Sequence, residues 1–297
     1  MNGNLSGNDV EHALIEWGRI PPVIRAMLIT STRARSDTTV DQLSDYDVVL
    51  IVQTLDPLVN DRTWINDFGE VLVVYWDPIY PDPDFGTDRT ANVTQYTSGL
   101  KIDFTLWPVA LFEQMVAAPT LPAELDAGYR ILLDKDGLTE GMRAPTGKAY
   151  IPKQPTDAVY QTLINDLFSD APYVAKCLWR DELLPARWCL DYDMKYVYLL
   201  PLLEWWVECE HGWALPTGWL GKGLKKHLPA TLWAKLEQTY AGASIADNWN
   251  ALLNTITLLR EVAVQVGAHL GYAYPHALDQ RVTEYVLHIR GMEPRGR

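Results

Sequence analysis

Apolar residues in the first half of the chain gather in four short runs separated by polar turns. The runs are residues 22–30, 46–52, 70–76 and 100–108. Their length and their β-branched and aromatic content predict β-strands. Apolar residues at helical spacing lie between or before these runs, in residues 9–18, 61–69 and 109–119. Strands with interspersed helices predict a mixed α/β domain over roughly residues 1–145.

The second half of the chain has the pattern of helices. A stretch rich in Gly, Pro and Thr, residues 136–156, has the composition of a linker. Beyond it, apolar residues recur three to four positions apart in residues 155–184, 193–210 and 248–271. Thr156 followed by Asp157 suits a helix start. We therefore expect an all-α bundle domain over residues 146–297, and an α+β protein as a whole.

Composition agrees with two folded domains and restricts the partners. The chain has 297 residues, 48% of them hydrophobic, and a formal net charge of −13. A strongly acidic protein is a poor match for the phosphate backbone of nucleic acids, so we expect no nucleic-acid partner. An acidic surface would attract a cationic small substrate. The alternative, of equal weight, is that the charge only serves solubility.

Targeting signals and disulfide patterns are not recognisable in the sequence. The N-terminus lacks a basic start followed by an apolar core, and the most apolar window, residues 196–207, is too short to span a bilayer and contains Pro201 and Glu204. Three cysteines, Cys177, Cys189 and Cys209, form no close pair. We expect reduced thiols, no membrane association and a cytoplasmic location.

Two aspartates one residue apart stand at the start of the second strand. Asp45 and Asp47 would project to the same side of that strand, where like charges require solvent or a cation. If the strand of Asp103 lies beside theirs, three carboxylates converge, as in phosphoryl-transfer sites that hold Mg²⁺. The alternative is chance, because Asp-x-Asp occurs in many chains.

A hydroxyl-rich turn, Ser31-Thr32-Arg33, follows the first strand. If a helix begins there, its free N–H groups would attract an anion. Thr32 could donate a hydrogen bond to a phosphate oxygen, and Arg33 could bind phosphate through two nitrogens. The alternative is an ordinary helix cap.

These motifs resemble one known family. The segments 24–49 (IRAMLITSTRARSDTTVDQLSDYDVV), 63–70 (TWINDFGE), 99–108 (GLKIDFTLWP) and 173–184 (YVAKCLWRDELL) are similar, in order, to segments of the aminoglycoside 6-adenylyltransferases. These enzymes are the streptomycin-modifying members of the nucleotidyltransferase superfamily. The resemblance covers nearly the whole chain.

The resemblance implies a fold and a reaction. The fold would be a nucleotidyltransferase domain of polymerase-β type followed by a helical substrate-binding domain. Asp45, Asp47 and Asp103 would hold Mg²⁺, with ATP as co-substrate, and Asp103 could also act as the base. An aminoglycoside hydroxyl would attack the α-phosphate of ATP and release pyrophosphate, giving resistance.

Further binding roles are expected in both domains. Ser31, Thr32 and Arg33 would contact the nucleotide, and Lys176 and Lys222 would neutralise its β- and γ-phosphates. Glu182 and Asp191 would contact the cationic groups of the drug. Ordinary helix faces with local ion pairs are the alternative for these charged residues. The assembly would be a monomer or a small homo-oligomer.

Two departures from the family pattern bear on activity. The family has Gly-Ser where this chain has Ser31-Thr32, so nucleotide binding could be weaker. A family aspartate falls on Trp188, which puts the drug specificity in doubt. The alternatives are a nucleotidyltransferase with a protein or RNA acceptor, and a non-catalytic relative that binds drug or nucleotide. The acidic balance disfavours RNA, and the complete set of aspartates favours catalysis.

Overall fold

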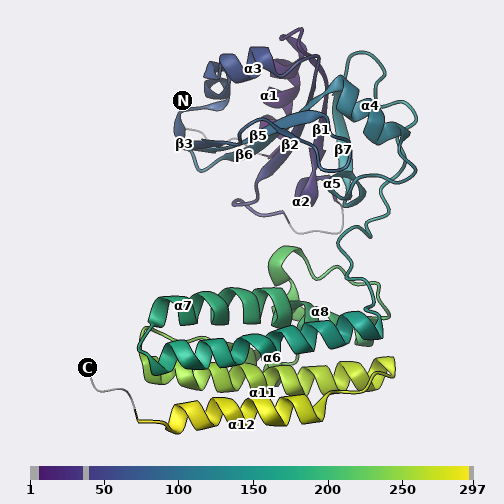
Figure 1. Ribbon diagram of the computed structural model, residues 1–297. Coiled ribbons are helices and arrows are strands. Elements are labelled where there is room, and N and C mark those ends of the chain that lie inside the picture. Colours follow the sequence, from purple (N-terminus) through teal and green to yellow (C-terminus); the bar gives the residue numbers. More distant parts are fainter. Residues whose placement is uncertain (1–6, 36–39, 294–297) are drawn as a thin grey trace. The chain divides into compact units, whose positions relative to one another are not determined.

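The computed structural model describes residues 7–35 and 40–293. The chain divides into two compact units, residues 1–149 and 150–297. Figure 1 shows a sheet flanked by helices in the first unit and a bundle of helices in the second. The division lies in the segment that the sequence predicts to be a linker. The mixed sheet and the many helices of an α+β protein are confirmed.

The first unit is built on one mixed sheet of seven strands. The strands are β1 (Ile24–Thr30), β2 (Tyr46–Val52), β3 (Val71–Trp76), β4 (Tyr80–Pro81), β5 (Asp88–Tyr96), β6 (Lys101–Pro108) and β7 (Tyr129–Asp134). Their order is β3-β5-β6-β2-β1-β7, and β4 pairs with β5. Strands β2 and β6 are parallel, and the other pairs are antiparallel.

Three strands, β4, β5 and β7, were not among those predicted. Strand β5 was missed because its inward positions are polar: Thr90, Asn92 and Thr94 are buried in place of apolar residues. The hydroxyls there find acceptors, since Thr94 Oγ1 donates to Asn92 Oδ1 over 2.8 Å and Thr90 Oγ1 donates to the carbonyl of Asp77 over 3.0 Å. A strand stabilised in this way carries no hydrophobic alternation for a sequence pattern to detect.

One face of the sheet packs on an aromatic core. Helix α1 (Gly7–Arg19) and the 3₁₀ helix η1 (Thr63–Phe68) contribute to it. The rings of Trp17 and Trp64 stack with centroids 5.2 Å apart, and Phe104 from β6 meets Trp64 edge-on at 4.9 Å. The predicted helix over 61–69 is therefore a shorter 3₁₀ helix.

The opposite face is only partly covered. Helix α4 (Val109–Ala117) and the short α5 (Ala123–Asp126) pack on Leu28, Val49 and Trp107. Two further short helices, α2 (Ser31–Ala34) and α3 (Asp56–Asn60), follow β1 and β2. The apolar cover stops short of Asp47 and Asp103, which remain partly exposed. This open part of the sheet face carries the candidate site.

The second unit is a helical bundle with its own core. Its helices are α6 (Asp157–Trp179), α7 (Leu183–Arg187), η2 (Trp188–Leu199), α8 (Leu200–His211), η3 (Trp219–Gly221), α9 (Leu224–His227), α10 (Ala230–Glu237), α11 (Ile245–Leu270) and α12 (His276–Gly291). Helix α6 packs on α12, α11 and η2 (Figure 1). Its start agrees with the predicted cap, because the Thr156 side chain accepts a hydrogen bond from the N–H of Val159.

The segment η2 has π-helical geometry rather than the continuous α-helix predicted over 193–210. Helices α11 and α12 are tied by a buried carboxylate, Asp279, which accepts hydrogen bonds from Arg260 Nη2 (2.6 Å), the Tyr274 hydroxyl (2.8 Å) and Thr283 Oγ1 (3.0 Å). Across the described residues, none of the helices combines the length and the apolar character that crossing a bilayer requires.

Candidate active site

Two of the predicted carboxylates stand side by side on neighbouring strands. In the parallel pairing of β2 with β6, Asp47 lies directly opposite Asp103. Paired residues point to the same face of a sheet, and adjacent strands are about 4.8 Å apart. Asp45 comes two residues before Asp47 and lies at the same edge. The sheet therefore gathers the three aspartates that the sequence singled out.

A lysine that the sequence reasoning did not identify connects the outer two carboxylates. Lys101 Nζ lies 2.5 Å from Asp45 Oδ2 and 2.9 Å from Asp103 Oδ2. The signal was its spacing: Lys101 is two residues before Asp103, so both side chains share one face of β6. The ammonium group of Lys101 thus neutralises the carboxylates of Asp45 and Asp103 at the same time.

Electrostatics at the cluster oppose ionisation of Asp47 and Asp103. Burial raises the pKa of Asp47, and the negative charge of Asp103 raises it further, while a hydrogen bond donated by the Ser31 hydroxyl acts in the opposite sense. Burial also raises the pKa of Asp103, although Lys101 partly offsets this. No group in the described part of the chain donates a hydrogen bond to the buried Asp103 Oδ1.

These observations test whether the residues fit a metal ion. Mg²⁺ and similar hard cations prefer carboxylate oxygens, and a cation bound between Asp47 and Asp103 would reverse the pKa increases of both groups. An uncompensated buried oxygen on Asp103 is a free ligand for such an ion. The donor set therefore fits a divalent cation.

The turn after β1 places Ser31 beside the carboxylates. Ser31 adopts a φ of 60°, in the left-handed region that glycine occupies more easily. This conformation brings its hydroxyl within hydrogen-bonding reach of Asp47. Helix α2, with only four residues, is too short to carry a helix dipole, and Thr32 is partly exposed on it.

Arg33 is hydrogen-bonded to the backbone of the segment that leads into β2. Its Nε donates to the carbonyl of Asp45 over 2.9 Å, and its Nη2 donates to the carbonyl of Ser44 over 2.7 Å. The guanidinium also lies 3.7 Å above the ring of Tyr46. These contacts fix the backbone of the Asp-x-Asp segment, so Arg33 positions the carboxylates whether or not it also binds phosphate.

The predicted residues of the helical unit have varied environments. Lys176, Lys222 and Glu182 are exposed, and Lys176 Nζ lies 6.0 Å from the ring centroid of Tyr285. Asp191 is neutralised by neighbours in α7 and η2, because Arg187 Nε donates to it over 2.8 Å and Lys195 Nζ over 2.6 Å.

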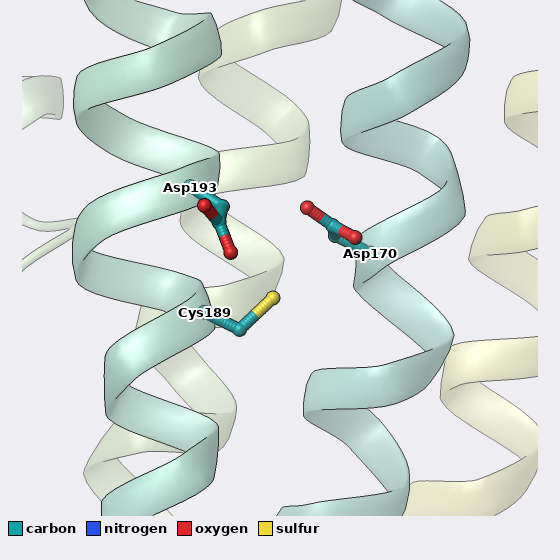
Figure 2. Close-up of side chains that lie close together, drawn as sticks. All are labelled: Asp170, Cys189 and Asp193. Atoms are coloured by element: carbon teal, nitrogen blue, oxygen red, sulfur yellow. The ribbon is translucent and has the colours of Figure 1, made fainter.

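A second acidic group in the helical unit was not predicted as a site. Figure 2 shows Asp170 of α6 facing Cys189 and Asp193 of η2. One ligand atom from each residue lies within 4.8 Å of the others. Burial raises the pKa of the Cys189 thiol, and the neighbouring Asp170 carboxylate raises it further. Acidic groups of this kind are common on protein surfaces, and we assign no ion to this one. Trp188 immediately precedes Cys189 in the sequence, and its side chain is exposed. It stands at the position where the resemblance places a family aspartate.

Comparisons with known proteins identify the family. The model of the streptomycin adenylyltransferase family matches residues 6–289. An aminoglycoside 6-adenylyltransferase of Campylobacter jejuni is 26% identical over 287 residues, covering 95% of this chain and 95% of the relative. The protein of the same name from Bacillus subtilis (strain 168) is 26% identical over 267 residues, covering 88% and 90%.

Among solved structures, an aminoglycoside 6-adenyltransferase from Bacillus subtilis aligns with 97% of this chain and 99% of its own, at 21% sequence identity and a TM-score of 0.45. Family membership follows from the family model, which matches almost the full sequence. The chain therefore belongs to the streptomycin adenylyltransferase family of nucleotidyltransferase enzymes.

Proposed function

We propose that this protein transfers the adenylyl group of Mg²⁺–ATP to a hydroxyl of an aminoglycoside, with streptomycin and its 6-position as the first candidates. The observation that carries the proposal is the pairing of Asp47 with Asp103 on parallel strands, with Asp45 at the same edge. The relatives from Campylobacter and Bacillus, named as aminoglycoside 6-adenylyltransferases, support the acceptor class.

Asp45, Asp47 and Asp103 are the residues that would hold the metal. When bound, a divalent ion supplies positive charge that neutralises the phosphates and makes the acceptor hydroxyl more acidic. Lys101 then has to release at least one carboxylate, since it pairs with both Asp45 and Asp103 in the structure.

The chemical step needs a base and a route for the leaving group. The acceptor oxygen forms a bond to the α-phosphorus, the bond from that phosphorus to the α–β bridging oxygen breaks, and pyrophosphate leaves with the bonding electrons. The acceptor proton goes to Asp103. A carboxylate that also holds a metal would be only a modest base, and the metal would compensate by lowering the pKa of the acceptor hydroxyl.

The remaining nucleotide contacts would come from the turn and the helical unit. We propose that the hydroxyls of Ser31 and Thr32 and the guanidinium of Arg33 face the phosphates. Lys176 and Lys222 carry exposed ammonium groups suited to the β- and γ-phosphates. Glu182 offers an exposed carboxylate to a cationic acceptor, whereas Asp191 could do so only after its pairs with Arg187 and Lys195 open.

Pyrophosphate release tests the function directly. Purified protein would be incubated with Mg²⁺–ATP and, in turn, streptomycin, spectinomycin, kanamycin and RNA, with mass spectrometry to detect the adenylylated product. We expect release with streptomycin and none with RNA. Release only with RNA or a protein acceptor would favour the macromolecular alternative, and drug binding without any release would favour a non-catalytic relative.

A matched pair of variants tests the metal site. Asp47→Asn removes a ligand while preserving shape, so we expect kcat to fall by about 10³-fold or more. Asp56→Asn makes the same change at an exposed carboxylate of α3 and should leave kcat unaltered. Full activity in Asp47→Asn would contradict the metal assignment.

A further inference from the structure

The carboxylates belong to a longer row of side chains that crosses the sheet. The strand registers pair Thr30 with Asp47, Asp47 with Asp103, Asp103 with Val93, and Val93 with Tyr75. Directly paired residues project to the same face of a sheet. The row therefore runs from the end of β1, next to the Ser31 turn, through the acids and on to Tyr75 in the edge strand β3.

The far end of this row is exposed and apolar. Tyr75 and Val73 are each 61% exposed, and Val93 is 36% exposed. Val73 pairs with Gln95, whose neighbour in the next strand is Lys101, so it lies on the same face as Tyr75. We call Val73, Tyr75 and Val93 the β3–β5 shelf. Exposed apolar side chains on an edge strand invite aggregation, so their presence beside a charged site calls for a ligand.

We propose that the β3–β5 shelf binds the acceptor, with the ring of Tyr75 packed against the aminoglycoside. The inference rests on the proposed function and names the part of the site that recognises its acceptor. In phosphoryl transfer the entering and leaving oxygens lie roughly in line on opposite sides of the phosphorus. With the pyrophosphate toward the Ser31 turn, the acceptor approaches from the other end of the row, over β5 and β3.

The dimensions of the row suit this arrangement. Tyr75 is two strand spacings from Asp103, or about 10 Å along the sheet. An aminoglycoside of several rings is longer than this distance. When one of its hydroxyls reaches Asp103, the rest of the molecule is therefore long enough to extend over Val93 to Tyr75.

The chemistry of the shelf also suits an aminoglycoside. The face of a tyrosine ring attracts ammonium and guanidinium groups, and it packs well against the C–H groups of a sugar ring. The formal net charge of the protein, −13, adds a general attraction for a cationic ligand. A free anion or an apolar peptide would not match this combination.

Variants of Tyr75 separate the contribution of its ring to drug binding from that of its hydroxyl, and a neighbouring variant controls for effects on the stability of β3. For Tyr75→Ala we expect the KM for streptomycin to rise about tenfold, with the KM for ATP unchanged and kcat within about twofold. Tyr75→Phe keeps the ring and should restore the wild-type KM. The control is Val74→Ala, on the same strand but paired with Thr94 on the opposite face, which should leave the KM for streptomycin unaltered.

Direct titration of streptomycin by calorimetry distinguishes failure of the shelf from failure of the proposed function. If wild-type protein adenylylates the drug but Tyr75→Ala binds it equally well, the shelf is wrong and the function stands. If wild-type protein binds the drug without turnover and Tyr75→Ala binds it about tenfold less tightly, the shelf is supported and the function fails.

Two other outcomes would overturn the shelf. One is that wild-type protein binds no aminoglycoside at all. The other is that the protein sediments as a dimer that Tyr75→Ala dissociates, because the edge strand would then serve pairing between two copies.

Discussion

Ser31 is the residue at which conformation and chemistry are most directly linked. It holds a left-handed backbone that most side chains avoid, and in that conformation its hydroxyl lies near Asp47 and acts to lower the pKa of that carboxylate. The family glycine at this place would adopt the same backbone without strain but has no hydroxyl. With serine, this chain accepts a strained backbone at residue 31 and gains a hydroxyl. That hydroxyl favours the ionised form of Asp47, which we propose binds metal.

Substitutions at Ser31 can separate these two effects. Ser31→Ala and Ser31→Gly both remove the hydroxyl, but only glycine relieves the backbone. We expect the free energy of unfolding of Ser31→Gly to exceed that of Ser31→Ala by about 1 kcal/mol, as measured by urea denaturation. Ser31→Gly should also bind ATP more tightly than Ser31→Ala in a calorimetric titration. Equal stability of the two variants would show that the turn relaxes to a different conformation.

Sequence reasoning reached the aspartates but not their partners. Strand spacing alone put Asp45 and Asp47 on one face and drew attention to Asp103. It did not give Lys101 because a lysine near an acid is common, and only the pairing of β2 with β6 shows that it spans two carboxylates. The backbone angle of Ser31 and the contacts of Arg33 depend on the fold around them and have no signature in composition.

At the scale of elements, the parallel pairing of β2 and β6 determines the site, and hydrophobic pattern predicted both strands. Their adjacency is a property of the sheet order, which the pattern did not contain. The same limit explains why Tyr75 was not recognised: the predicted strand over 70–76 exists, but its place at the sheet edge beside β5 depends on a strand with polar inward positions.

The contact between α11 and α12 allows a prediction about pH and stability. Burial raises the pKa of Asp279, but hydrogen bonds from Arg260, Tyr274 and Thr283 outweigh it, so the pKa in the folded protein is lowered. A lowered pKa contributes stability that is present above the unfolded value and is lost as the pH falls through the folded value.

Replacing Asp279 by asparagine should reveal this contribution. We expect Asp279→Asn to lower the free energy of unfolding by about 2 kcal/mol at neutral pH. The difference from the wild type should begin to shrink as the pH falls below about 4, where the carboxylate of the unfolded chain takes up a proton, and should be lost as the pH passes the lowered pKa of the folded protein. Chemical denaturation followed by circular dichroism over a pH series measures it. Glu284→Gln, at an exposed carboxylate of the same helix, should change stability by less than about 0.5 kcal/mol at every pH.

At the scale of the whole molecule, the dominant property is a formal net charge of −13. An acidic protein attracts a cationic acceptor over a distance that salt shortens. Mg²⁺–ATP is an anion and gains nothing from this field. The two substrates should therefore respond differently to ionic strength.

Steady-state kinetics at about 50 mM and about 300 mM KCl would measure this response. We expect the KM for streptomycin to rise several-fold with salt, and the KM for ATP to stay level or fall. A parallel rise in both constants would indicate a general effect of salt on the protein instead of long-range attraction of the acceptor.

The parallel register of β2 with β6 also limits how the gene can vary. Side chains alternate between the faces of a strand, so one codon gained or lost ahead of Asp103 within β6 would turn its carboxylate toward the aromatic core. Residues 135–156 form neither helix nor strand and have no such alternation to preserve, but Asp136 and Thr146 bond to Arg25 and Asp126 of the first unit, so the less constrained part follows Lys148. Insertions, deletions and engineered tags are better tolerated there. Within β2 and β6, the number of residues has to stay the same so that Asp47 and Asp103 keep the same face.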